Sequence, residues 1–188
     1  MAAQSSDFND QVEYLKSTVR SIPDYPKAGI LFRDITTLCT DPKAFALCNK
    51  LLYEEFKDKR IEAVVSAEAR GFVFGAPLAN ALECAFVMVR KPGKLPAKTI
   101  EEHYELEYGT STLQMHEDAL KPGQRVLVLD DLVATGGTVD AMLRLVKRLQ
   151  ATPVAAAFII DLFDLGGVEN IRKNWNIEVF SLLKFPGH

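Results

Sequence analysis

Val126-Leu127-Val128-Leu129 runs directly into Asp130-Asp131-Leu132-Val133-Ala134-Thr135-Gly136-Gly137-Thr138, and this stretch decides the fold of the 188-residue chain. The four apolar residues do not alternate with polar ones, which is typical of a strand buried on both faces of a parallel sheet. After Thr138, apolar residues recur at helical spacing as far as Leu149, with charged residues between them. The sequence therefore predicts a buried strand, a glycine loop and an amphipathic helix in succession.

The loop between this strand and this helix has the composition of an anion-binding site. A helix N-terminus offers free backbone N–H groups and partial positive charge, and Gly136-Gly137 would let an anion approach the backbone closely. The carboxylates of Asp130 and Asp131 would repel a phosphate, so we expect them to face the vicinal hydroxyls of a sugar from exposed positions at the strand end. The implied ligand is a sugar phosphate. A plain strand–turn–helix with an acidic turn remains the alternative.

The run from Val128 to Thr138 resembles the signature by which type I phosphoribosyltransferases bind phosphoribosyl diphosphate (PRPP). The resemblance extends from about residue 21 to about residue 164 and is strongest with the members of the family that use adenine. It implies that the two acids hold the ribose hydroxyls and that residues 134–138 hold the 5′-phosphate. It also implies the reaction of purine salvage in which PRPP and adenine give AMP and diphosphate.

Composition is consistent with one globular domain over residues 1–188. The chain is 48% hydrophobic and 25% charged, and strand and helix patterns alternate along it. We therefore expect a single-domain α/β fold with a doubly wound, mainly parallel sheet. The net charge of −3 gives no general attraction to nucleic acid or membrane, no stretch resembles a targeting signal or membrane span, and three cysteines without C-x-x-C spacing favour a reducing cytoplasm.

Residues 1–35 are expected to form an N-terminal helical extension and a segment of the base site. Apolar residues from Phe8 to Ile22 recur at helical spacing, which predicts a first helix ending just before Pro23. The segment Ile30-Leu31-Phe32-Arg33-Asp34-Ile35 reads on its own as an edge strand with an exposed arginine. The family resemblance instead implies that Leu31, Phe32 and Arg33 contact adenine, and that Leu162 covers its second face.

Two cationic loops follow predicted strands. In Ser66-Ala67-Glu68-Ala69-Arg70-Gly71-Phe72, Arg70 could simply pair with an acid at a helix start, and Ser66 stands where relatives are expected to have glycine. In Arg90-Lys91-Pro92-Gly93-Lys94, the cations could belong to a solvated turn. The resemblance implies that Arg70, Arg90, Lys91 and Lys94 bind diphosphate. It also implies a homodimer, because the Arg-Lys pair acts largely from the partner subunit in relatives.

Residues 97–119 switch to strand-like alternation and read as a flexible, hairpin-like flap. Glu107-Tyr108-Gly109 within it resembles the family's catalytic Glu-Tyr-Gly, which implies a catalytic Glu107 and a flap Tyr108. An alternating strand could equally expose Glu107 to water. The three histidines, His103, His116 and His188, have no ligand-like spacing, so we do not expect them to bind metal.

The family resemblance implies Mg²⁺ as the cofactor. This ion keeps several waters and takes substrate phosphates as ligands, so it is expected to reach the site through PRPP without direct protein ligands. Two alternatives remain open from the sequence. One is a PRPP-binding regulator on the same fold, and the other is a phosphoribosyltransferase for another nucleobase.

Overall fold

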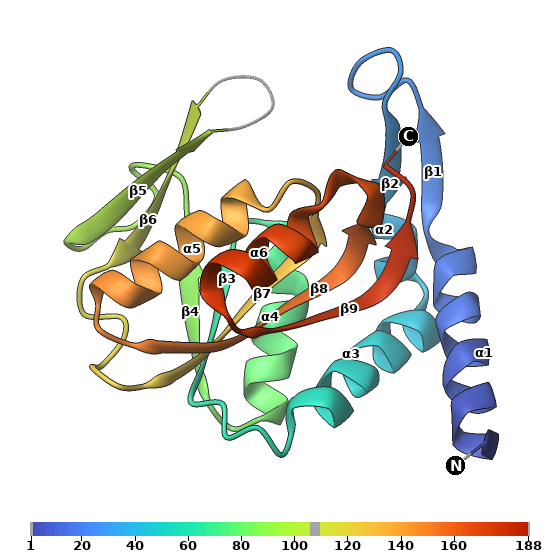
Figure 1. Cartoon of the computed structure of the whole chain (residues 1–188), viewed down its shortest axis with the longest axis horizontal. Helices are drawn as coiled ribbons and strands as arrows, with labels where there is room; N and C mark the ends of the chain where they lie inside the picture. The colour runs from blue at the N-terminus through green and yellow to red at the C-terminus, as the bar shows by residue number, and fades with distance from the viewer. Residues whose placement is uncertain (1, 106–109, 188) are drawn as a thin grey trace.

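The centre of the protein is a five-stranded parallel sheet, seen in a computed structural model that describes residues 2–105 and 110–187 (Figure 1). Each strand is parallel to its neighbours. This confirms the expected α/β fold with a doubly wound, mainly parallel sheet. The strands stand side by side in the order β4 (Ala85–Val89), β3 (Ala63–Ala67), β7 (Arg125–Val133), β8 (Thr152–Leu162) and β9 (Glu178–Phe185).

Strand β7 is buried on both faces, as its unbroken apolar run predicts. Val126 and Val128 belong to one core cluster, whereas Leu127 and Leu129 belong to the other. Successive side chains of a strand point to opposite faces, so the two clusters lie on the two sides of the sheet. Helices α5 (Gly137–Arg148) and α6 (Gly167–Trp175) contribute to the first cluster, and α1 (Ala2–Thr18), α2 (Thr36–Thr40), α3 (Pro42–Phe56) and α4 (Arg70–Ala81) to the second.

The first helix ends earlier than its spacing predicted. Helix α1 stops at Thr18, and β1 (Arg20–Pro23) pairs antiparallel with β2 (Leu31–Asp34), which places Ile22 opposite Phe32. Arg20 Nε donates to Asp34 Oδ2 at 3.1 Å across this pair. Hydrogen bonds from Thr36 and Arg20 lower the pKa of Asp34 to about 2. A partner strand and a buried carboxylate thus replace the last turn of the expected helix.

Helix α3 begins at a side-chain cap followed by a proline. The Asp41 side chain accepts hydrogen bonds from the backbone N–H groups of Lys43, at 2.9 Å, and Ala44, at 3.1 Å, and Pro42 occupies the first turn. A cap of this kind contributes about 1 kcal/mol to stability. Cys48 is fully buried in the same helix, so it is a core residue, and all three cysteines are free thiols.

The expected hairpin departs from the sheet beside helix α5 (Figure 1). Strands β5 (Thr99–Glu105) and β6 (Thr110–His116) pair antiparallel from Thr99 opposite His116 to Glu105 opposite Thr110. Buried Leu113 and Met115 anchor β6 in the first core cluster. Within residues 2–105 and 110–187, no helix combines the length and the apolar character needed to cross a membrane.

The topology gathers the candidate site residues at one edge of the sheet. Strands β3, β4 and β7 are parallel neighbours, so their carboxyl ends meet there. The chain leaves β3 toward Arg70, leaves β4 toward Lys91 and leaves β7 toward the glycine loop. Ligands of open α/β sheets bind at this edge.

Candidate active site

The glycine loop has the geometry of an anion cradle. Gly136 adopts φ +94° and caps α5, whose first helical hydrogen bond runs from Asp140 N to Gly136 O at 2.9 Å. The preceding backbone N–H groups of this turn therefore have no partner within the helix. A side chain at Gly136 would be strained by the positive φ, and its Cβ would lie 3.2 Å from Gly167 O. Both constraints require glycine at the tightest point of the loop.

Gly167 supports this loop, a role that the sequence did not reveal. A Cβ at Gly167 would lie 2.4 Å from the carbonyl oxygen of Ala134 and 3.0 Å from Gly136 N. Asn170 Nδ2 on the same helix donates to Thr135 O at 3.5 Å. The structure shows that the start of α6 packs against the backbone of the cradle.

The two acids are buried, which corrects the expectation that they are exposed. Asp130 is 7% and Asp131 8% exposed, because β7 continues to Val133 and pairs with β8 as far as Asp161. Both acids therefore belong to a strand that is paired along its length. Asp131 N donates to Asp130 Oδ1 at 2.9 Å. Burial, followed by repulsion from Asp131, raises the pKa of Asp130 well above its ordinary value.

Arg70 joins the acid pair to the segment expected to bind the base. It is the first residue of α4, and its Nε donates to Asp131 Oδ2 at 2.5 Å. Its guanidinium carbon also lies 5.7 Å from the centre of the Phe32 ring. The alternative of an ion pair at a helix start is thus present in the structure. A role of Arg70 in binding diphosphate remains a prediction.

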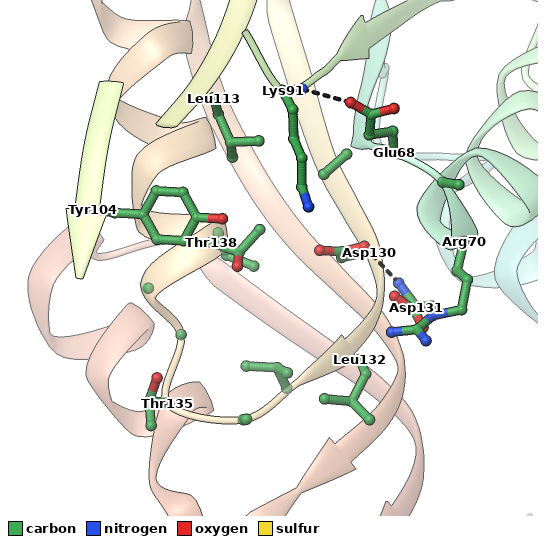
Figure 2. A pocket seen from close by; sticks show the side chains of 17 residues that line it. Glu68, Arg70, Lys91, Tyr104, Leu113, Asp130, Asp131, Leu132, Thr135 and Thr138 are labelled. Atoms are coloured by element: carbon green, nitrogen blue, oxygen red, sulfur yellow. Dashed lines mark hydrogen bonds and ion pairs between the residues drawn. The ribbon is translucent and has the colours of Figure 1, made fainter. Parts of the chain in front are cut away.

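Glu68 fastens the two cationic loops together, and the sequence did not single it out. Its carboxylate accepts from Lys91 N at 2.6 Å and from Arg90 Nη2 at 2.9 Å. Burial opposes ionisation, but these two donors prevail and lower the pKa of Glu68. Arg90 Nη1 donates to Lys94 O at 3.2 Å. The backbone of the second loop is therefore fixed against the end of β3, and the Lys91 side chain extends toward the acid pair (Figure 2).

A cavity of about 640 Å³ brings most of the expected PRPP contacts together (Figure 2). Arg90 and Lys94 lie outside its lining, as do all four residues expected to contact adenine. Leu113 and Tyr104 add an apolar wall contributed by the hairpin. The expected contacts that line the cavity are Arg70, Lys91, Asp130, Asp131, Ala134, Thr135, Gly136, Gly137 and Thr138.

The segments expected to hold adenine are formed by β2 and the end of β8. Phe32 packs edge-on against Tyr25, with ring centres 5.1 Å apart. The Arg33 guanidinium lies 4.8 Å from the ring centre of Phe185 and donates to Pro186 O at 3.0 Å. The Arg33 side chain thus fastens the C-terminal segment to β2. Leu31 and Leu162 are each half-buried.

The proposed catalytic Glu107 and Tyr108 lie outside the described residues. Among the residues that the structure does describe, no group of histidine, cysteine, aspartate and glutamate side chains could hold a metal ion by itself.

Comparisons with known proteins agree with this geometry. Residues 34–182 match the family model of the phosphoribosyl transferase domain. The adenine phosphoribosyltransferases of Klebsiella pneumoniae strain 342 and Cronobacter sakazakii are 60% and 58% identical to the chain over 178 residues, which cover 95% of this chain and 97% of each relative.

Solved structures give the same result. The crystal structure of adenine phosphoribosyltransferase from Thermoanaerobacter pseudethanolicus superposes with a TM-score of 0.88 at 45% identity, covering 93% of this chain and 99% of that one. The Saccharomyces cerevisiae enzyme superposes with a TM-score of 0.84 at 37% identity, with the same coverage. Family model, sequence relatives and structural neighbours all cover the strand, loop and helix that form the cradle. The chain therefore belongs to the phosphoribosyltransferase family and, within it, to the adenine phosphoribosyltransferases.

Proposed function

We propose that this protein transfers the 5-phosphoribosyl group of PRPP to adenine, giving AMP and diphosphate, and thereby serves purine salvage. The observation that carries the proposal is the cavity in which an anion cradle, a buried acid pair and two cations meet. Relatives that are 58–60% identical over nearly their whole length bear the name of this activity. The Saccharomyces cerevisiae relative was solved with adenine bound, which supports the choice of base.

In this proposal, PRPP spans the cavity from the glycine loop to the cationic loops. Residues 134–138 hold the 5′-phosphate, and Asp130 and Asp131 accept hydrogen bonds from the ribose hydroxyls. Arg70 leaves Asp131 to meet the diphosphate, and Lys91 approaches the same group. Preorganised cations stabilise the negative charge that develops on a leaving group.

The reaction is a displacement at the anomeric carbon of ribose. The C–O bond to diphosphate breaks and diphosphate leaves with the bonding electrons, while a ring nitrogen of adenine forms the new C–N bond and loses its proton. Glu107 is the proposed acceptor of that proton, with Tyr108 beside it on the flap. Leu31, Phe32 and Leu162 would enclose the purine ring, and Arg33 would contact its edge.

Magnesium is the proposed cofactor, and the donors in the cavity are compatible with it. Mg²⁺ is commonly bound by substrate phosphates, waters and one or two carboxylates. The residues Asp130, Asp131 and Glu68 line the cavity, and their carboxylates would be available to an ion carried by PRPP. When bound, the ion neutralises charge on the departing diphosphate.

We further propose a homodimer formed through the face made by α4 and β4. Strand β4 is the edge of the sheet, and Val73 and Met88 are 38% and 46% exposed beside it. Phe72 of α4 and Phe86 of β4 also pack edge-on, at 5.7 Å between ring centres. If a second copy docks on this apolar face, the loop that carries Arg90 and Lys94 in one subunit would come close to the cavity of the other subunit. Free thiols support a cytoplasmic location for this assembly.

The test is release of diphosphate from Mg-PRPP with a panel of nucleobases. We expect rapid release with adenine alone. Faster turnover with orotate, hypoxanthine or uracil would reject the base assignment and leave the transferase class. Binding of PRPP without turnover on any base would favour a regulator.

A further inference from the structure

Tyr104 stands at the border between the hairpin and the phosphate cradle. It lies near the end of β5 and lines the main cavity together with Leu113 and Thr138. It also lines a neighbouring cavity together with Gly137, which is the first residue of α5. In Figure 2 its phenol projects into the main cavity on the side of Thr138. The hydroxyl is therefore directed at the space above the cradle.

The Tyr104 ring and its hydroxyl are in different environments. The ring is half-buried against the first core cluster, so its orientation is set by apolar packing. The hydroxyl makes no hydrogen bond to any residue that the structure describes. A phenol in a partly buried position normally finds a polar partner. An oxygen of a ligand in this cavity would supply such a partner.

The position of Tyr104 relative to the cradle is fixed by a clamp between β5 and α5. The Glu102 carboxylate meets Arg148 Nη1 at 3.0 Å and Arg144 Nε at 3.3 Å. The carbonyl oxygen of His103 accepts from Arg144 Nη2 at 3.5 Å. The two residues before Tyr104 are thus tied to the helix whose first turn forms the cradle. These contacts hold the phenol in place beside the first turn of α5.

We propose that Tyr104 binds the 5′-phosphate of the ribose phosphate, with its phenol donating a hydrogen bond to a phosphate oxygen. The inference rests on the proposed function, because it requires a sugar phosphate in the cradle. The loop supplies backbone donors at the sheet edge, and Tyr104 supplies a further donor from the hairpin, on the side of Thr138. Glu102 is a positioning residue, which acts by holding β5 on α5.

The test is Tyr104→Phe, which removes the hydroxyl and retains the packed ring. Affinity for ribose 5-phosphate is measured by calorimetric titration, beside affinity for inorganic diphosphate, which is also a phosphate anion but lacks the sugar. A hydrogen bond to a charged group contributes enough to change affinity by about tenfold or more. We expect ribose 5-phosphate to bind about tenfold more weakly and diphosphate to bind as in the parent. Tyr53→Phe, in helix α3, is the matched control and should change neither affinity.

The outcomes separate this inference from the proposed function. If the parent binds ribose 5-phosphate and Tyr104→Phe binds it equally well, Tyr104 is only a packing residue and the inference is wrong. Equal weakening of ribose 5-phosphate and diphosphate would also overturn it, because a 5′-phosphate contact predicts selectivity. If the parent itself binds no ribose 5-phosphate, the result contradicts the proposed function, on which the role of Tyr104 rests. In turnover assays, Tyr104→Phe should raise the KM for PRPP with little change in kcat.

Discussion

At the scale of single residues, the proposed ribose contact of Asp130 comes at the expense of stability. A buried carboxylate beside a second carboxylate is costly, and the raised pKa of Asp130 expresses that cost. The folded protein holds this proton more tightly than the unfolded chain, whose reference pKa is 3.8. Stability is therefore lost as pH rises from about 4 through the pKa of the folded state.

Asp130→Asn should remove the loss of stability that occurs as pH rises. We expect a higher melting temperature than that of the parent at pH 8, and a flatter dependence of stability on pH above about 4. PRPP should bind about ten- to a hundredfold more weakly, because a charged acceptor for the ribose hydroxyls is gone. Thermal unfolding across a pH series and calorimetry with PRPP measure both effects. Asp118→Asn, in an exposed turn, is the control, and a variant less stable than the parent at every pH would contradict the argument.

Glu107→Gln tests the proposed proton acceptor. The change keeps the size of the side chain and removes its basicity, so turnover should fall about 10²–10⁴-fold while PRPP affinity stays near that of the parent. Single-turnover kinetics with adenine and Mg-PRPP measure the chemical step. Glu117→Gln, an exposed acid in the same segment of residues 97–119, should behave as the parent does. Turnover within a few-fold of the parent would show that Glu107 is an exposed strand residue.

At the scale of elements, the glycine loop depends on a helix from the far end of the chain. Gly167→Ala would place a methyl group against the Ala134 carbonyl, and overpacking of this kind costs about 1–3 kcal/mol. We expect the cradle to shift and ribose 5-phosphate to bind at least tenfold more weakly, with the helix content of the protein unchanged. Calorimetry and circular dichroism measure the two effects. Lys173→Ala, on the exposed side of α6, should leave both unchanged, and parent-like affinity in Gly167→Ala would show that the loop does not rely on α6.

The sequence predicts elements whose signals are local. Strand β7, its loop and α5 follow from an apolar run, a glycine pair and a helical period within one continuous stretch. The boundary between α1 and β1 could not be found in this way, because it depends on pairing with β2 and on the Arg20–Asp34 contact. A helical period that continued to Ile22 was therefore misleading.

The candidate site residues also differ in whether their signal is local in the sequence or depends on contacts between distant segments. The acids and glycines of the proposed cradle carry a motif, so the sequence alone is enough to propose them. Glu68 and Gly167 act by touching loops that are distant in sequence, and only the fold brings those contacts together. The burial of Asp131 was missed for a related reason, since it depends on how far β8 pairs with β7.

At the scale of the whole molecule, the cavity lies beside an apolar face at the edge of the sheet. Val73 and Met88 are large apolar residues that stay exposed on this face, and strand β4 lies at the edge of the five-stranded sheet. The loop that follows β4 carries Arg90 and Lys94, which line no part of this chain's own cavity. A second copy docked on this face would cover the apolar surface, and these cations would then lie beside the cavity of the partner subunit.

Val73→Asp and Met88→Asp should therefore disrupt assembly and activity together. A carboxylate in an apolar interface loses its hydration without gaining a partner, so each change should shift the protein from dimer to monomer in light scattering. Turnover should fall in parallel, because each site would lose cations from the partner subunit. Phe8→Asp replaces an exposed apolar residue on α1, 42% exposed, and should leave the dimer and the activity intact. A fully active monomer, or a dimer unaffected by both changes, would show that the site is complete in one chain and that copies meet elsewhere.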